Sequence, residues 1–197
     1  SRGLGDVYKR QVRAELDWLL RVEDEACALT DRFRAGELPL RVTHNDTKIN
    51  NVLFDTQTHK PLVVIDLDTV MPGLIGHDFG DAIRFAANFV EEDCPDASKA
   101  GVNLNIYWAF AEGFLKYTAS TLTEAEVETL GTSCFALACE LATRFLDDYI
   151  LGDRYFKIKY PTHNLVRTRC QIALAKDMQR KMNAMNAIVL DCWRRNR

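Results

Sequence analysis

The chain has 197 residues, enough for one well-buried domain or for one lobe of a larger enzyme. Hydrophobic residues make up 47% and charged residues 27%, which is the balance of an ordinary globular protein. A net charge of -3 excludes a basic field for nucleic acid and a polybasic membrane patch. The apolar runs are too short to span a bilayer and no secretory signal is recognisable, so we expect no nucleic-acid or membrane partner.

The cysteines indicate a reducing compartment. The chain has six of them with no C-x-x-C pair, at positions Cys27, Cys94, Cys134, Cys139, Cys170 and Cys192. Three of them (Cys134, Cys139 and Cys170) fall in apolar helical patterns, where a free thiol behaves as a small hydrophobe. These spacings favour buried, reduced thiols in a cytoplasmic protein, with a zinc site as the alternative.

The first eleven residues differ in origin from the rest of the chain, as their sequence indicates. The stretch Asp6 to Gln11 is what one reading frame of a common transposase sequencing adapter translates to. We therefore expect residues 1–11 to be a read-assembly artefact and native sequence to begin near Val12. Residues 12–197 then form one native unit.

The first half of that unit predicts one helix followed by a small β region. Apolar residues at helical spacing indicate a helix over 12–34, ended by Gly36 and Pro39. Residues 41–51 indicate a strand that passes into a loop. Two β-type runs, 52–54 and 62–65, flank a polar turn and predict a hairpin. The hairpin would bring Asn51 and Asp66 close together.

The second half predicts helices throughout. Asp78 is a suitable N-cap, with Asp81 in the first turn of its helix. Thr123 and Glu126 form a capping-box pattern, and Gly152 is a stop signal. Thr162 or Asn164 would cap the last helix. We expect four helices, over residues 78–90, 104–118, 124–151 and 162–194. The fold class is therefore α+β and mostly α-helical, with one small β-hairpin.

Polar residues in and after the first loop are those that phosphoryl transfer from a metal-bound nucleotide requires. Asp46 is suited to accept the proton of an acceptor hydroxyl, and Lys48 to neutralise the transferring phosphate. Asn51 and Asp66 offer hard oxygen ligands for Mg²⁺. Asp68, two residues further on, would share a face with Asp66 as a second carboxylate.

Each of these residue types also has a structural interpretation. A lone His-x-Asp is common in loops, and an Asp at a strand end is usually a turn or cap residue. The complete spacing from His44 to Asp66 favours chemistry, with His44 holding the loop by hydrogen bonds. For Asp78 and Asp81, capping or loop bracing is favoured over catalysis.

The spacing resembles a known family. His44 to Asn51 follows the protein-kinase template H-x-D-x-K-x-x-N, which precedes a metal-binding Asp. Together with Ile65-Asp66 it looks like the aminoglycoside phosphotransferase and choline kinase branch of the protein-kinase-like fold. Further segments are similar to the N-acetylhexosamine 1-kinases, and these are 42–51, 65–70, 78–84, 144–149, 152–156, and 163–165 with Arg167.

This resemblance implies a function and a set of contacts. The enzymes it points to use ATP and magnesium to phosphorylate the anomeric hydroxyl of N-acetylglucosamine or N-acetylgalactosamine. It implies that Asp46 is the base and that Asn51 and Asp66 are metal ligands. Arg144 and Tyr155 are candidate sugar contacts, because an Arg fork suits hydroxyl groups and an aromatic ring suits a sugar face. Asn45 is a further candidate.

The chain departs from the family pattern before residue 44. No glycine-rich phosphate loop and no strand Lys paired with a helix Glu precede His44, so the sequence resembles the C-terminal lobe alone. We expect residues 12–197 by themselves to bind ATP poorly and to turn over little.

Two alternatives stay open. One is a related kinase of choline, homoserine or an aminoglycoside, although Arg154, Lys157 and Lys159 argue against a polycationic acceptor. The other is a non-catalytic binding fragment, which the intact Asp46, Lys48, Asn51 and Asp66 argue against. Neither the preferred hexosamine nor the oligomeric state is evident from the sequence.

Overall fold

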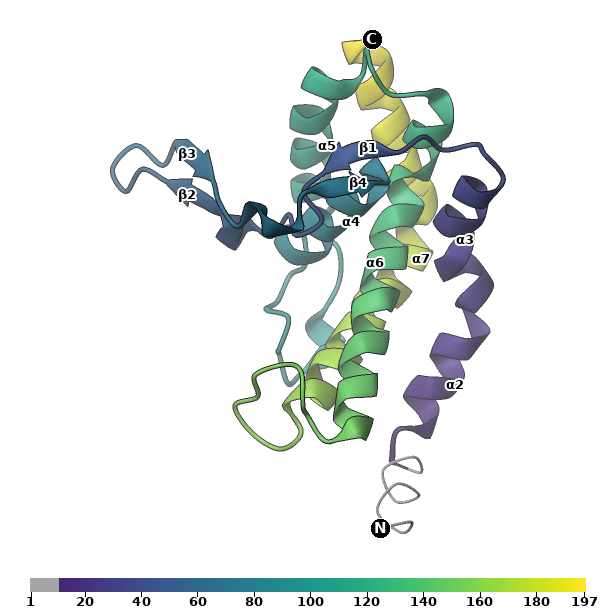
Figure 1. Cartoon of the computed structure of the whole chain (residues 1–197), viewed down its shortest axis with the longest axis vertical. Helices are drawn as coiled ribbons and strands as arrows, with labels where there is room; N and C mark the ends of the chain where they lie inside the picture. The colour runs from purple at the N-terminus through teal and green to yellow at the C-terminus, as the bar shows by residue number, and fades with distance from the viewer. Residues whose placement is uncertain (1–10) are drawn as a thin grey trace.

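A computed structural model describes residues 11–197. The expected artefact segment, apart from Gln11, lies outside the described residues. The described residues form these helices and strands in chain order (Figure 1): α2 Arg13–Arg21, α3 Glu23–Arg34, β1 Arg41–Thr43, β2 Val52–Phe54, β3 Pro61–Val64, β4 Met71–Gly73, α4 Ile75–Ala86, α5 Leu104–Thr118, α6 Glu124–Leu151 and α7 His163–Asn196. Single turns of 3-10 helix lie at η1 Ile49–Asn51, η2 Leu67–Thr69 and η3 Ala97–Lys99.

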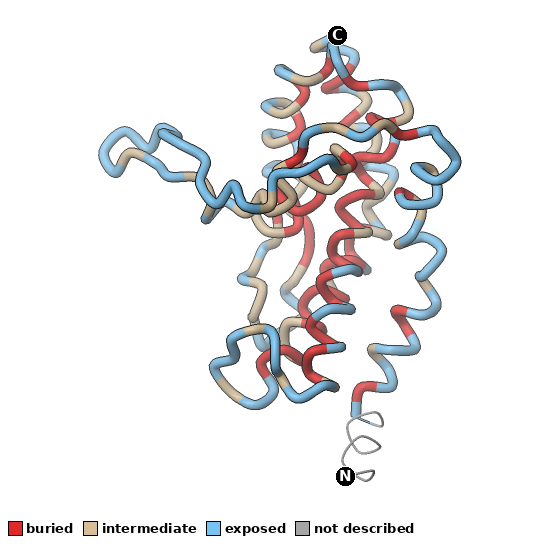
Figure 2. The backbone as a smooth tube through the Cα atoms, in the orientation of Figure 1, coloured by how far each residue is buried: buried red, intermediate tan, exposed pale blue. Residues whose placement is uncertain are grey.

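The body of the molecule is helical and is built around two long helices. α6 and α7 lie side by side, and α3, α4 and α5 pack against them (Figure 1). Buried residues follow the facing sides of α6 and α7 (Figure 2), including Phe135, Leu165 and Met178. Within residues 11–197, no helix combines the length and apolar character needed to cross a bilayer.

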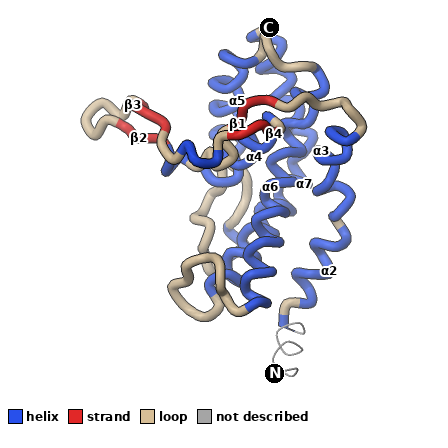
Figure 3. The backbone as a smooth tube through the Cα atoms, viewed as in Figure 1, coloured by secondary structure: helices blue, strands red, loops and turns tan. Residues whose placement is uncertain are grey.

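The strands form two small antiparallel ribbons, one nested inside the other in sequence. β1 pairs with β4, with Val42 opposite Pro72, and β2 pairs with β3, with Val52 opposite Val64. The inner ribbon is the hairpin expected from residues 52–65, and it projects from the helical body (Figure 3). Its apolar side chains are left exposed, including Leu53, Leu62 and Val63. The loops that join the two ribbons contain the candidate catalytic residues.

Most helix ends agree with the sequence. α5 spans the expected residues, Thr123 and Glu126 form both bonds of the capping box, and Gly152 ends α6 with φ +89°. The expected single helix over 12–34 is instead broken at Val22, whose ψ of 10° separates α2 from α3.

β1 is held against the start of α6 by one ion pair. The Nε and Nη2 atoms of Arg41 donate to the two carboxylate oxygens of Glu126 at 2.8 and 2.7 Å. Burial opposes ionisation of Glu126, but the bonds from Arg41 and from the Thr123 backbone outweigh it and lower the pKa of this carboxyl. The strand that leads into the candidate catalytic loop therefore has a fixed starting point.

Close packing of α4 on α6 requires a glycine at position 80. A Cβ placed on Gly80 would lie 2.6 Å from the carbonyl oxygen of Ser133, which is helix backbone and cannot move aside. We expect Gly80→Ala to lower the free energy of unfolding by about 1–3 kcal/mol, because the two helices must separate. Chemical denaturation measures this change.

Gly113→Ala is the matched control, since Gly113 also lies in a helix and a Cβ there meets nothing within 4 Å. Alanine favours a helix over glycine, so this variant should gain up to about 1 kcal/mol. Equal losses in the two variants would contradict the packing argument.

Candidate functional site

The two loops between the ribbons lie against each other and are tied by hydrogen bonds. The backbone N–H of Ile65 donates to the carbonyl of Asn51 at 2.9 Å, which continues the hairpin pairing. Closer to the helices, Thr69 Oγ1 donates to the carbonyl of His44 at 2.6 Å, and Asn45 Nδ2 donates to the carbonyl of Thr69 at 3.0 Å. Residues 44–51 and 65–70 therefore form one polar site.

Asp78 holds this site from the first turn of α4. Its carboxylate accepts the backbone N–H groups of His44 and Asn45 at 2.8 and 2.7 Å, and its carbonyl accepts the hydroxyl of Thr47 at 2.7 Å. The expectation that Asp78 is an N-cap was wrong, because α4 begins at Ile75 and Leu74 occupies the N-cap position. The alternative interpretation of Asp78 as a loop brace is confirmed.

Asp46, Lys48 and Asn51 form a compact group at the centre of the loop. Lys48 Nζ lies 3.0 Å from Asp46 Oδ1, and Asn51 Nδ2 donates to Asp46 Oδ2 at 2.9 Å. Partial burial opposes ionisation of Asp46, but the bonds from Lys48 and Asn51 outweigh it and hold the pKa of Asp46 below its usual range. Asp46 is thus an ionised carboxylate at neutral pH, held by Lys48 and Asn51.

His44 contributes to the loop through its ring. Nε2 lies 3.2 Å from the carbonyl oxygen of Ile65, and since a carbonyl only accepts, this nitrogen carries the proton. The contact joins the start of one loop to the start of the other, which agrees with a holding role for His44.

The donor set at the junction fits magnesium. The amide nitrogen of Asn51 is engaged by Asp46, whereas its oxygen accepts no hydrogen bond from residues 11–197. Asp66 is exposed, and its left-handed φ of 61° turns the chain directly after β3. Asp68, two residues further on, lies in η2 and is also exposed. The expectation that it shares a strand face with Asp66 was wrong, because β3 ends at Val64 and the chain turns at Asp66. No three His, Cys, Asp or Glu side chains of the described part converge on one point, so phosphate oxygens would have to complete the coordination sphere.

The other candidate residues lie in two separate places. Asn45 has a left-handed φ of 62°, and both ends of its side chain are engaged: Oδ1 accepts from Thr43 Oγ1 at 3.0 Å, while Nδ2 contacts two carbonyls. Arg144 lies in the second half of α6, and its guanidinium is 5.7 Å from the ring centroid of Tyr155. These two residues contact each other, and none of the hydrogen bonds or ion pairs found in residues 11–197 joins them to the catalytic loop.

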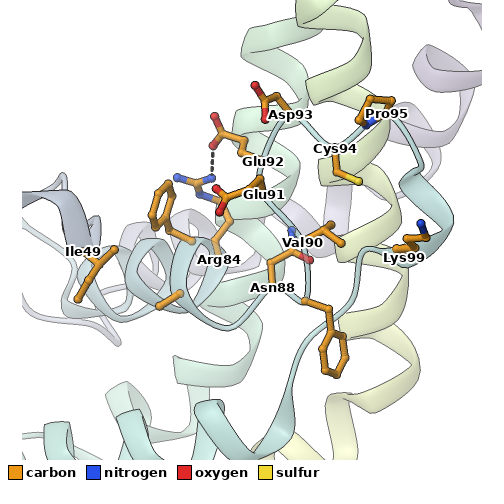
Figure 4. A pocket seen from close by; sticks show the side chains of 13 residues that line it. Ile49, Arg84, Asn88, Val90, Glu91, Glu92, Asp93, Cys94, Pro95 and Lys99 are labelled. Atoms are coloured by element: carbon orange, nitrogen blue, oxygen red, sulfur yellow. Dashed lines mark hydrogen bonds and ion pairs between the residues drawn. The ribbon is translucent and has the colours of Figure 1, made fainter.

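A cavity of about 820 Å³ adjoins the catalytic loop, and neither Arg144 nor Tyr155 lines it. Ile49 of the catalytic loop lies on one side of it, and the acidic run Glu91, Glu92 and Asp93 lies on another (Figure 4). Asp93 in turn accepts from Lys159 Nζ at 2.7 Å, and Lys159 belongs to the loop that contains Tyr155. The volume is within the usual range for small-molecule sites, about 300–1,000 Å³.

Two of the three acids in this run are neutralised. Arg84, 1% exposed, pairs with Glu92 at 2.6 Å and with Asp81 at 2.7 Å. Burial opposes the charge of Arg84, but these two carboxylates outweigh it and raise its pKa. Asp93 is held by Lys159 and also by His163 Nε2 at 3.1 Å. Glu92 and Asp93 are therefore each held by a cation of the protein.

Sequence reasoning did not identify Arg84, Asp93 or Asp148 as site residues. Their partners lie between 3 and 70 positions away in the sequence. Only Arg84 gave a local signal, because it is a charged residue within an apolar helical pattern.

A carboxylate, a lysine and an amide gathered beside a second acidic loop define a site suited to phosphoryl transfer. The profile of the phosphotransferase enzyme family (APH) matches residues 1–114, which is more than half of the chain. The protein belongs to this family. The mostly helical body with two small β ribbons is compatible with that membership.

Proposed function

We propose that residues 12–197 form the catalytic and acceptor-binding lobe of an ATP-dependent kinase that phosphorylates the anomeric hydroxyl of an N-acetylhexosamine. The observation that carries the proposal is the group formed by Asp46, Lys48 and Asn51, placed directly beside Asp66 at the junction of the two ribbons. Family membership supports phosphotransfer, and the acceptor is inferred from Arg144 and Tyr155 and from the paired acids of the cavity wall.

In this mechanism Asp46 accepts the proton of the anomeric hydroxyl as its oxygen attacks the γ-phosphorus and the bond to the leaving ADP oxygen breaks. Lys48, now paired with Asp46, turns toward the γ-phosphate when the nucleotide is present and neutralises its charge. Asn51 and Asp66 would hold Mg²⁺, with Asp68 as a further carboxylate, and the bound ion neutralises phosphate charge. Asp78 keeps the loop in place throughout.

The acceptor assignment is based on charge and shape. A polycation such as an aminoglycoside would need unpaired acids, and Glu92 and Asp93 are already paired with Arg84 and Lys159. Arg144 and Tyr155 instead offer hydrogen-bond donors beside an exposed aromatic ring, which suits a neutral sugar. Asn45, whose amide is engaged inside the protein, would act on the acceptor by shaping the loop.

We further propose that an N-terminal lobe outside this sequence clamps the nucleotide and that residues 12–197 alone turn over little. The two exposed faces of the β2–β3 hairpin support this, because they offer apolar surface for another part of the protein. The six cysteines, all of them free thiols, support a cytoplasmic location.

The test is a phosphate-transfer assay with Mg-ATP on the protein extended by its upstream sequence. The acceptor panel is N-acetylglucosamine, N-acetylgalactosamine, choline, homoserine and an aminoglycoside. We expect the two hexosamines to have the highest kcat/KM, with product phosphorylated at the anomeric oxygen. Preference for any other acceptor contradicts the sugar assignment, and no transfer to any acceptor contradicts the kinase assignment.

A further inference from the structure

Asp148 organises the loop that follows α6. This residue is 4% exposed, and its Oδ1 accepts the backbone N–H groups of Arg154 and Tyr155, each at 2.8 Å. Its Oδ2 accepts from the backbone N–H of Phe156 at 3.0 Å and from Asn164 Nδ2 at 2.9 Å. One buried carboxylate thus holds three consecutive backbone donors of residues 154–156.

The chain enters this arrangement through a reversal. Gly152 and Asp153 both have left-handed backbone, with φ of 89° and 55°, and Asn164 Nδ2 also donates to Asp153 Oδ1 at 2.8 Å. Burial opposes the charge of Asp148, but the backbone N–H groups outweigh it and lower the pKa of this carboxyl. The charged form of Asp148 therefore fixes the direction in which the side chains of residues 155 and 156 leave the backbone.

These two side chains point to different places. Phe156 packs inward on Phe145, with ring centroids 4.7 Å apart, whereas Tyr155 is 73% exposed. The guanidinium of Arg144 lies over both rings, 5.5 Å from Phe156 and 5.7 Å from Tyr155. The result is an exposed aromatic face beside several unused N–H donors, a combination that binds a sugar ring and its hydroxyl groups.

The loop is also tied to the wall of the cavity beside the catalytic loop, through Asp93. Lys159 of this loop pairs with Asp93 of the cavity wall, and the backbone N–H of Lys159 donates to Nδ1 of the buried His163 at 3.1 Å. Both ends of the segment that contains Tyr155 are therefore anchored, one by Asp148 and the other by Asp93 and His163.

We infer that Asp148 is a positioning residue for acceptor binding, which fixes the backbone of residues 154–156 so that Tyr155 and Arg144 present one preassembled surface to the sugar. This inference rests on the proposed function, because it assumes that the acceptor binds at Arg144 and Tyr155. Asp148 itself touches no substrate.

The test uses the 197-residue chain and three variants. Asp148→Asn removes the charge at nearly constant volume, and Asp147→Asn makes the same change at the adjacent, exposed residue. Tyr155→Ala removes an exposed ring without affecting the buried bonds. Amide hydrogen exchange of residues 154–156, the unfolding midpoint, and the affinity for N-acetylglucosamine by NMR titration are measured for each.

We expect Asp148→Asn to exchange amides 154–156 at least about tenfold faster and to weaken sugar binding by about tenfold. Tyr155→Ala should weaken binding similarly with amide 156 still protected, and Asp147→Asn should match the wild type. If Asp148→Asn changes amide exchange and the unfolding midpoint but leaves the sugar affinity unaltered, Asp148 has a purely structural role. That result would overturn the inference about Asp148 and leave the proposed function standing. No measurable binding of the sugar by the wild type would overturn the proposed acceptor, and the acceptor role of Asp148 with it, whatever the exchange rates.

Discussion

Replacement of Asp46 by Asn is expected to lower kcat of the complete kinase by about 10²–10⁴-fold, with little change in KM for the sugar. The substitution keeps the size of the side chain and the bond with Asn51, but it removes the group that accepts the hydroxyl proton. Lys48 also loses its partner, since an amide does not pair with an ammonium as a carboxylate does. Steady-state kinetics with the preferred hexosamine measure the effect.

Asp24→Asn is the control for this variant, because Asp24 is an exposed acid on α3 and lies outside the site. It should retain the kinetics of the unmodified enzyme. Turnover within a few-fold of normal in Asp46→Asn would show that another residue is the base.

Replacement of Asp78 by Ala is expected to have the second-largest effect, on both stability and activity. The backbone N–H groups of His44 and Asn45 would lose their acceptor in a half-buried position, at a cost of about 2–4 kcal/mol. The catalytic loop would also be free to shift, and displacement of a reacting group by about 1 Å is enough to reduce kcat about 10²-fold.

Asp55→Ala is the matched control for Asp78→Ala. Asp55 also accepts two backbone N–H groups, those of Gln57 and Thr58, but it does so at the exposed tip of the β2–β3 hairpin. Water replaces the lost acceptor there, so we expect only a small change in the denaturation midpoint and none in kcat. If both variants lose stability equally, burial of the Asp78 bonds is not the cause.

The sequence predicts those features whose signals are local. The capping box at Thr123, the end of α6 at Gly152 and the hairpin over residues 52–65 each depend on residues within a few positions of one another. The candidate residues from His44 to Asp66 were also evident, because they flank one hairpin on its two sides. Their contacts in the structure agree with the proposed chemistry without testing it.

Features that depend on distant partners could not be predicted in this way. The neighbours of Asp78 in the sequence predict an N-cap. In the structure its carboxylate oxygens instead accept backbone N–H groups that lie 33 and 34 residues earlier in the chain. Arg84 is buried with Asp81 and Glu92 as its partners, and Glu92 comes from the following loop, so this pairing is not evident from the helix alone. The break at Val22 lacks a Gly or Pro, so only the packing of α2 and α3 on α6 and α7 accounts for it.

The nesting of one ribbon inside the other also has a kinetic consequence. β2 and β3 are joined by a short turn, so they can pair within microseconds without help from the rest of the chain. Their pairing shortens the effective loop between β1 and β4, which lowers the entropy that the second pairing must overcome. We therefore expect closure to proceed from the tip toward the helices and to bring residues 44–51 against residues 65–70. Insertions at the tip, over residues 55–60, would delay the first step while leaving the polar junction unchanged.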